Sequence, residues 1–428
     1  MQHEIINLYD SGESTRQIAR SLNVSQAKVC RVLKKNNIKG RPRRINKKLE
    51  SIIFNKYLSG ESSELIAQDV GVSASTVCRV VKRLGGEIRI PVLNKRKVSR
   101  YNTSSIVFYK SKELSSTYLN TLSQGEKDEV ADFLFGYFRK HGFPYPNYTD
   151  NELNDDFKRL VKSCGNIDGN IINSRGEAGL KIFKHYNQHY FFVSGSVGSK
   201  KSMIECFNDD DKLMKVIKNR VNNEFNITGN MLRQGMRTSW TAFGASIFRP
   251  ELAKTIYREF TNPSSIVLDI SAGFGQRMLG AHFVKQYIGL DPWTETICAL
   301  ERIKDRWNLP AVLHNIGSEY FNPSLKVDFC FSSPPFFNKE IYSLDKTQAY
   351  NTGFKNYLNW WQITINNVDK MLKPRGFFVV NMSKNLAPYL IRASKYSLNR
   401  TLEITYSRSH MSTKSSDCFY VLRKPTKC

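Results

Sequence analysis

The sequence predicts an α/β fold in its C-terminal half, preceded by two small all-α units and a mixed middle region. Three observations predict this fold class. One segment of the first 100 residues occurs twice at a fixed spacing. A strand, a glycine turn, a helix and a second strand follow one another over residues 264–291, and an apolar strand at 327–332 is interrupted by two prolines. Strands that alternate with helices and glycine turns are typical of a mostly parallel sheet covered on both faces.

The length of 428 residues indicates several domains. Changes in pattern divide the chain into residues 1–38 and 39–92 (one repeat each, the second preceded by a basic arm), 93–235 (linker and middle region) and 236–428 (the α/β domain). Residues 101–230 contain helix-like pieces at 126–139 and 152–162 and a strand-like run at 189–195, without recognisable chemistry. Because this region precedes the α/β domain, it is a candidate for target recognition.

Positive charge is concentrated at the N-terminus. Residues 1–100 hold 21 basic and 8 acidic side chains, so this segment carries +13 of the chain's net charge of +26. Such a concentration favours a polyanionic partner such as nucleic acid; a solubilising surface is the alternative, although acidic residues would serve that purpose better. No apolar stretch has the length of a membrane span, and the eight cysteines show neither CxxC pairs nor zinc spacing. We therefore expect a soluble, cytoplasmic, DNA-associated protein without a metal.

The two repeated segments begin at Leu8 and Lys56, offset by 48 residues. In each copy a short helix with an apolar face, a turn and a second helix are expected, which is a helix-turn-helix pattern. The second helix of such a motif enters the major groove of double-stranded DNA. A helical hairpin that contacts proteins is the alternative. The residues expected to contact DNA are Gln26, Lys28 and Arg31 in the first copy, and Ser73, Ser75, Thr76 and Arg79 in the second.

Between the copies lies the basic segment KGRPRRINKK, residues 39–48. With the second copy it resembles the DNA-binding domain of Hin-type serine recombinases, over residues 40–83 only. In that family a Gly-Arg-Pro-Arg arm lies in an A·T-rich minor groove. The resemblance therefore implies that Arg41, Arg43 and the adjacent Arg44 contact DNA, and the proline keeps the arm extended.

The α/β domain begins with a predicted buried strand, 266–268, that ends in Asp269. Gly273 and Gly275 form the following turn, and a second strand, 287–290, ends in Asp291. The glycines let the backbone approach a nucleoside ligand closely, and the acid after the second strand can accept hydrogen bonds from ribose hydroxyls. The turn lacks the third glycine of the dinucleotide fingerprint, which disfavours a pyrophosphate ligand.

A further strand, VDFCFS at 327–332, runs directly into Ser333, Pro334, Pro335 and Phe336. Here the chain resembles the amino-group DNA methyltransferases, whose hallmark is Asp, Asn or Ser followed by Pro-Pro and an aromatic residue. The resemblance covers residues 240–428 and implies a Rossmann-like class I methyltransferase domain with S-adenosylmethionine as cofactor. The Ser333 hydroxyl and a carbonyl near Pro334 would accept the amine's N–H bonds and free its lone pair, while Phe336 would stack on a flipped base.

The same resemblance implies the cofactor pocket. The segment at 244–260 is similar to the F-x-P segment that packs over the methionine part of the cofactor. Many relatives have an acid contacting the adenine where this chain has HNIGSEYF, 314–321, so Ile316, Ser318 and Glu319 all stay open for that contact. The expected cofactor contacts are Phe248, Pro250, Asp269, Ser271, Ala272, Gly273, Gly275, Asp291, Pro292, Ile316 and Ser318. The aromatic residues Phe337, Tyr342, Trp360 and Trp361 are expected in the core.

The leading hypothesis is a site-specific DNA methyltransferase that modifies an exocyclic base amine. Serine at the first position of the motif favours N4 of cytosine over N6 of adenine. An RNA amine methyltransferase is disfavoured by the GRPR arm, because A-form RNA offers no comparable minor groove. A DNA-binding regulator with an inactive methyltransferase fold is disfavoured by the intact set of motif residues. Transfer of a group other than methyl, the target sequence and the oligomeric state stay open.

Overall fold

The computed structural model describes residues 2–10, 15–36, 47–58, 63–72, 74–84, 105–174, 176–195, 201–238, 242–243, 245–337, 340–342, 353–404 and 417–426. The chain divides into two units, residues 1–88 and 89–428. In the described part, no helix is both long enough and apolar enough to cross a membrane.

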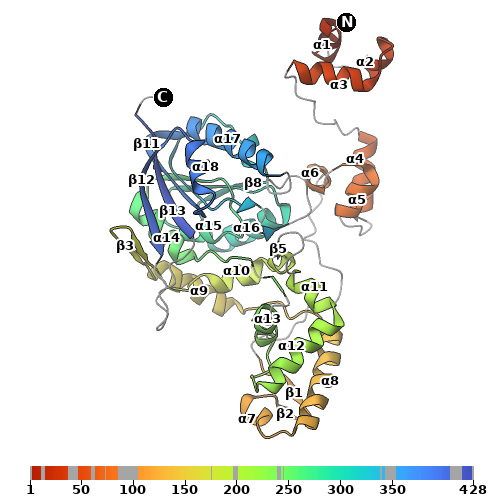
Figure 1. Ribbon diagram of the computed structural model, residues 1–428, viewed down its shortest axis with the longest axis vertical. Coiled ribbons are helices and arrows are strands. Elements are labelled where there is room, and N and C mark those ends of the chain that lie inside the picture. Colours follow the sequence, from red (N-terminus) through yellow and green to blue (C-terminus); the bar gives the residue numbers. More distant parts are fainter. Residues whose placement is uncertain are drawn as a thin grey trace. The chain divides into compact units, whose positions relative to one another are not determined.

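Each N-terminal repeat forms three helices, drawn in red and orange in Figure 1. The first copy has α1 (Gln2–Asp10), α2 (Thr15–Ser21) and α3 (Gln26–Lys35), and the second has α4 (Lys47–Leu58), α5 (Ser63–Val70) and α6 (Ala74–Arg83). The expected helix pairs are thus α2–α3 and α5–α6, and α1 and α4 are additional. Asn23 and Gly71, at equivalent positions of the two turns, both have positive φ angles, 48° and 67°. Both residue types tolerate this conformation better than others do.

Each of the two copies has its own small hydrophobic core. Ile18 of α2 packs with Val29, Val32 and Leu33 of α3, and the additional helix α1 contributes Ile5 and Tyr9. The equivalent residues of the second copy are Ile66, Val77, Val80, Val81, Ile53 and Tyr57. The same apolar pattern therefore produces the same three-helix packing twice, which supports a duplication.

The second unit is built on a sheet of nine strands among the described residues, in the order β3-β4-β12-β13-β11-β9-β6-β7-β8. Strands β8, β7, β6, β9 and β11 run parallel, and β13 runs antiparallel between β11 and β12. The hairpin β3–β4 extends the sheet beyond β12. The bounds are β3 Asn166–Asp168, β4 Ile171–Asn173, β6 Ile266–Asp269, β7 Gln286–Leu290, β8 Ala311–His314, β9 Val327–Ser332, β11 Leu372–Ser383, β12 Ser397–Ile404 and β13 Asp417–Arg423.

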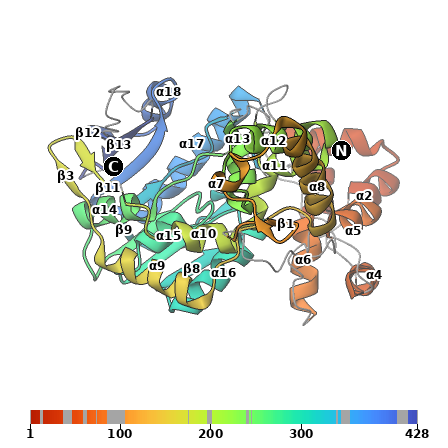
Figure 2. The same cartoon turned by 90° about the horizontal axis from the view of Figure 1, so that it is seen from below.

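Helices cover both faces of this sheet (Figures 1 and 2). Alternate strand residues enter different cores, as in β9, where Phe329 and Phe331 face one core and Cys330 faces the other. The first core includes α9 (Asp150–Lys162), α14 (Pro250–Phe260), α15 (Gln276–Gly280) and α16 (Thr294–Trp307), and the second includes α17 (Phe354–Met371) and α18 (Ala387–Arg392). The predicted α/β, Rossmann-like class is confirmed, because a strand pattern of period two is buried on both faces of a mostly parallel sheet.

The middle region divides between two cores. Helices α7 (Ser116–Leu119), α8 (Gln124–His141), α11 (Met203–Asn208), α12 (Asp210–Asn222) and α13 (Gly229–Thr238), with the hairpin β1 (Phe108–Tyr109)–β2 (Lys112–Glu113), lie around a core of their own. By contrast, α9 and α10 (Leu180–Tyr186) pack on the sheet. The strand expected at 189–195 is wrong for most of its length. Residues Gln188–Phe192 form a 3₁₀ helix, η1, and only Ser194–Gly195 form a strand, β5, because Tyr190 and Phe191 are buried side by side rather than on alternate faces.

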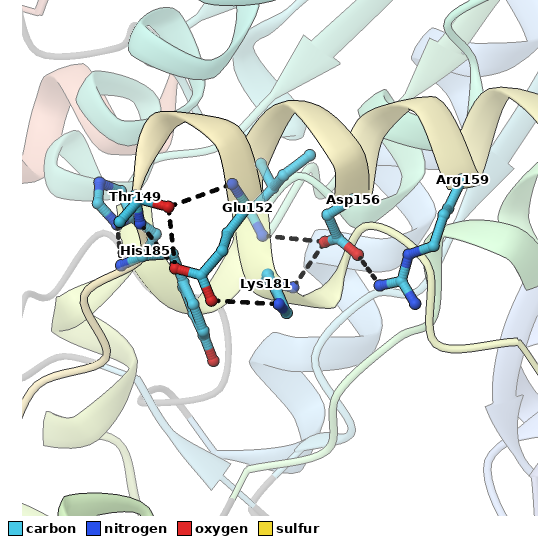
Figure 3. Close-up of polar contacts among 8 residues, drawn as sticks. Thr149, Glu152, Asp156, Arg159, Lys181 and His185 are labelled. Atoms are coloured by element: carbon cyan, nitrogen blue, oxygen red, sulfur yellow. Dashed lines mark hydrogen bonds and ion pairs between the residues drawn. The ribbon is translucent and has the colours of Figure 1, made fainter. Parts of the chain in front are cut away.

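A polar network joins α9 to α10 (Figure 3). The buried Asp156 carboxylate accepts hydrogen bonds from the backbone N–H groups of Lys181 and Ile182, at 2.8 and 3.3 Å, and pairs with Arg159. An acceptor at the start of a helix satisfies N–H groups that have no partner within the helix. Further along, the buried Asn187 amide donates to the carbonyl of Phe274 at 3.1 Å. The middle region is therefore attached directly to the predicted glycine turn.

Candidate active site

The glycine turn and the Ser-Pro-Pro-Phe segment follow neighbouring strands of the sheet. Strand β6 ends at Asp269 and β9 ends at Ser332, and the two strands are paired in parallel. Because the chain continues from β6 to β7 on one side and β9 lies on the other, the strand order reverses at this point. In doubly wound sheets ligands bind in the crevice at the carboxyl ends of such strands. Strand order therefore brings the two predicted motifs to one place.

A cavity of about 280 Å³ lies there, near the lower end of the usual size of small-molecule sites (roughly 300 Å³). Gly273 of the turn and Ser333 of the second motif both line it. The other predicted residues in its wall are Phe248, Ser271, Asp291, Pro292, Ser318, Pro334, Pro335 and Phe336. Pro250, Asp269, Ala272, Gly275 and Ile316 lie outside this wall, so any contact of theirs with a ligand would need another arrangement of the site.

Asp269 lies beneath the cavity and connects its walls. The fully buried carboxylate accepts hydrogen bonds from the Tyr287 hydroxyl at 2.8 Å and the Ser332 hydroxyl at 2.9 Å. It also pairs with the buried Arg277 guanidinium at 2.7 Å, and Arg277 donates to the carbonyl of Ser271. These donors satisfy the hydrogen-bonding capacity of a carboxylate that has no contact with solvent. Asp269 thus holds β6, β7, β9 and the glycine turn in fixed positions.

The glycine turn depends on backbone conformations that favour glycine. Gly273 and Gly275 have φ angles of 54° and 83°. A Cβ atom at position 275 would come within 2.0 Å of a terminal carbon of Leu300, so a side chain there would require the Leu300 side chain of α16 to move. The N–H of Gly273 donates to Asp291 at 2.9 Å. Tight turning and close packing account for both glycines of the sequence pattern.

Asp291 occupies the position expected after the second strand. Its carboxylate accepts hydrogen bonds from the N–H groups of Gly273 and Trp293, each at 2.9 Å. Burial raises the pKa of Asp291 to about 7, although these two hydrogen bonds favour the ionised form. A carboxyl with a pKa near neutrality at a cavity wall is typical of a functional site.

Ser333 has a fixed hydrogen-bond partner across the sheet. Its hydroxyl donates to Oδ1 of Asn381, in β11, at 3.0 Å. The Asn381 amide nitrogen donates to the carbonyl of Cys418 at 3.3 Å. A carbonyl can only accept, so the amide must present its nitrogen to Cys418 and its oxygen to Ser333. The single Ser333 proton is thereby directed at Asn381, and the lone pairs of the hydroxyl stay available to accept hydrogen bonds.

A residue of α17 forms a hydrogen bond with the remainder of the Ser-Pro-Pro-Phe segment. The Tyr357 hydroxyl donates to the carbonyl of Pro335 at 2.7 Å. Phe336 is half-buried in the cavity wall, and Phe337 has a positive φ of 47°. Of the aromatic residues expected in the core, Trp361 is fully buried, whereas Tyr342 and Trp360 line the cavity.

Several cavity residues were missed by the sequence analysis. Among them are Gln276, Trp293, Glu340 and Asn381. Gln276 directly follows Gly275, and its buried amide nitrogen has no hydrogen-bond partner among the residues that the structure describes. Trp293 follows Asp291 by two residues, so a search around each motif could have found these two. Glu340 and Asn381 lie outside any motif, and only the folded sheet brings them to the cavity.

The residues predicted to contact DNA lie largely on the outer faces of α3 and α6. Gln26, Lys28, Arg31 and Arg79 are exposed, and Thr76 is half-buried. The Gln26 amide also donates to the Thr15 hydroxyl at 3.0 Å. Ser75 lies in α6, but its side chain is outside the described part, as are residues 41, 43, 44 and 73 altogether.

Comparisons with known proteins add little beyond the fold. No family model matches the chain, and no curated protein matches it. TrmN from Thermus thermophilus is 16% identical with a TM-score of 0.32, over 41% of this chain and 49% of that one, so the chain spans about half of its length. The N-methyltransferase NodS from Bradyrhizobium japonicum is 14% identical (TM-score 0.29; 38% and 88%), and an rRNA methylase from Streptococcus thermophilus is 13% identical (TM-score 0.29; 42% and 99%). The fold class of the second unit, defined by its own strand order, is the Rossmann-like one of class I methyltransferases.

Proposed function

We propose that this protein transfers a methyl group from S-adenosylmethionine to an exocyclic base amine in double-stranded DNA, with N4 of cytosine favoured over N6 of adenine. The observation that carries the proposal is that Gly273 and Ser333 line the same cavity. A methyl donor and a base amine must meet in line within about 3–3.5 Å, so both sites have to open into one space.

The residues present fit the cofactor. The unpartnered amide nitrogen of Gln276 is a buried donor at the cavity wall, suited to a carboxylate. Asp291 offers acceptor oxygens for ribose hydroxyls, and the Phe248 ring lies in the same wall, beside the Arg277 guanidinium. The bound cofactor would supply an electrophilic methyl group on a sulfonium. The protein's part is to bind and orient it and to exclude water.

The amine is activated by acceptors rather than by a strong base. An exocyclic amine is a poor nucleophile because its lone pair is delocalised into the ring. The Ser333 hydroxyl, with its proton directed at Asn381, can accept one N–H, and a carbonyl near Pro334 can accept the other. Two such hydrogen bonds favour a tetrahedral nitrogen with its lone pair directed at the methyl group. Asn381 acts in this scheme as a positioning residue for Ser333.

Duplex DNA is proposed from the N-terminal unit. The outer faces of α3 and α6 carry Lys28, Arg31 and Arg79, and each is exposed. Two basic helical modules can contact phosphates and bases along one duplex, with an affinity that depends on salt. A base inside a duplex must be flipped out to reach a cavity of this kind.

The test is the identity of the modified base. Duplex DNA and RNA of matched sequence are incubated with the protein and a cofactor carrying a deuterated methyl group, digested to nucleosides and analysed by mass spectrometry. We expect labelled N4-methyldeoxycytidine from the DNA and no labelled nucleoside from the RNA. A label confined to RNA would favour the RNA enzyme, and no label on any nucleoside would contradict methyl transfer to a base.

A further inference from the structure

We infer that Glu340 accepts the proton that the amine loses when it is methylated. This inference rests on the proposed function. It concerns a step that the residues assigned so far leave open, because a primary amine that gains a methyl group must release one of its protons.

None of the groups that activate the amine can take that proton. The Ser333 hydroxyl already carries a proton, which it donates to Asn381. The Asn381 side chain is a neutral amide, and a backbone carbonyl is a very weak base. All three can accept hydrogen bonds, but none can hold a proton near neutral pH. The acceptor must be a different group.

Three carboxyls line the cavity among the described residues, in Asp291, Glu319 and Glu340. Asp291 directly follows β7, and Glu319 lies in the 3₁₀ helix η2 (Ser318–Tyr320) that follows β8. In the sheet β7 and β8 lie on the far side of β6 from β9. The two oxygens of Asp291 accept the N–H groups of Gly273, in the glycine turn, and of Trp293, and Glu319 accepts from the Trp360 indole at 3.0 Å. These two carboxyls belong to the nucleoside side of the cavity.

Glu340 belongs to the other side, next to the proposed amine site. It begins β10 (Glu340–Ile341), four residues after Phe336. One carboxylate oxygen accepts the N–H of Ser246 at 2.9 Å, and the other accepts the Tyr342 hydroxyl. Ser246 precedes Phe248 by two residues, so this hydrogen bond holds the carboxylate beside the F-x-P segment, and the Ser-Pro-Pro-Phe segment lines the same cavity. Those segments are the proposed positions of the sulfonium and of the amine.

The Glu340 carboxylate is also held rigidly and largely out of water. The residue is 8% exposed, and its backbone pairs with Gly195 of β5. The two donors fix the positions of both carboxyl oxygens at the cavity wall, where one of them can take up a proton. Neither donor is a cation.

Methyl transfer to the amine and proton transfer to Glu340 belong to one reaction. The amine nitrogen forms a bond to the methyl carbon as the carbon–sulfur bond breaks, and the electron pair of that bond goes to sulfur. One N–H proton moves from the methylated nitrogen to a Glu340 oxygen. The products are a secondary amine, a neutral thioether and a neutral Glu340, which returns its proton to water when the site opens.

Two substitutions at position 340 test the assignment. Glu340→Gln keeps the shape and an acceptor for the Ser246 N–H but cannot take a proton, so single-turnover methylation should slow by about 10²–10⁴-fold. Glu340→Ala should be equally slow and should regain activity with added formate, but not with chloride at the same ionic strength. Full speed of Glu340→Gln, or no formate effect in Glu340→Ala, would overturn the assignment.

A binding measurement gives a readout independent of turnover. Sinefungin carries an ammonium group in place of the sulfonium methyl, whereas S-adenosylhomocysteine is uncharged there. Calorimetry on Glu340→Gln should show unchanged affinity for S-adenosylhomocysteine and a several-fold smaller preference for sinefungin. An unchanged preference would place Glu340 away from the methyl group and contradict the inference. Failure of the proposed function itself would differ, because the unchanged protein would then leave no methyl label on any nucleoside.

Discussion

The two sets of candidate functional residues lie in opposite environments. Those on α3 and α6 are exposed to solvent, whereas those at the ends of β6 and β9 line a cavity. Arg31 and Arg79 are exposed, and the small cores beneath them serve only to hold the helices. Ser333 and Asp291 lie in a cavity wall, where their polar atoms already contact Asn381, Gly273 and Trp293. On the exposed faces each contact adds a modest and separable amount to binding. In the cavity one substitution changes the hydrogen bonding of its neighbours, so larger effects are expected there.

The largest effect is expected for Ser333→Ala. It removes the acceptor for one amine N–H, and turnover should fall on the order of 10³-fold, as for the loss of one transition-state hydrogen bond. Affinity for S-adenosylhomocysteine, measured by calorimetry, should stay near that of the unchanged protein. Ser333→Asn is the matched variant, because its amide oxygen restores an acceptor and should restore part of the rate. Equal turnover of Ser333→Ala and the unchanged protein would remove serine from the mechanism.

Deleting residues 1–92 should have the next largest effect, and on a different quantity. The deletion removes both helical copies and the arm, and duplex DNA affinity should fall by roughly 10²-fold, the lower end of what linked binding modules add. Cofactor binding should not change, because the cavity is lined by residues 246–419. Fluorescence anisotropy with a labelled duplex measures the affinity. If the shortened protein binds DNA as tightly, the N-terminal unit has another partner.

The strands could be predicted from the sequence because they are buried on both faces. Runs such as Ile266–Leu268 and Phe329–Phe331 are continuous apolar stretches followed by polar residues, and this pattern indicates both the strand type and the strand end. The helices α1 and α4 escaped prediction because the repeated segment begins only at Leu8 and Lys56, near the ends of these helices. Ile5 and Ile53, which anchor them, are also 48 positions apart, but they precede the two segments that were compared.

The site was predictable only as far as its motifs. Asn381 contacts Ser333 because β9 and β11 are neighbours in a register that pairs Val380 with Ser332. Neither the strand order nor this register can be read from a single sequence, since the two residues lie 48 positions apart. The backbone of Glu340 pairs with Gly195 of β5, in the middle region. The sequence predicted a longer strand there, over residues 189–195, and gave no sign that only Ser194–Gly195 would form it.

A smaller effect is expected from pH, through Asp291. Burial raises the pKa of this carboxyl to about 7. Ribose hydroxyls donate to an ionised carboxylate, so affinity for S-adenosylhomocysteine should rise with pH through that pKa. About a tenth of the carboxyls are ionised at pH 6 and about nine tenths at pH 8, which predicts an increase of about tenfold. Calorimetry of Asp291→Asn should show weaker binding without this dependence. A steep dependence that persists in Asp291→Asn would assign it to another group.

The smallest effect is expected for the paired substitution Arg41→Ala and Arg43→Ala, which tests the arm alone. Two lost contacts with the DNA backbone or minor groove should lower affinity for an A·T-rich duplex a few-fold and reduce the slope of log affinity against log salt by about 2. Lys140→Ala with Lys162→Ala is the control, because it removes the same charge from exposed positions of the second unit. If both pairs change the slope equally, general charge accounts for the effect. If only the arm pair does, and more on A·T-rich than on G·C-rich duplexes, a minor-groove contact is the simpler explanation, because that groove distinguishes these base pairs.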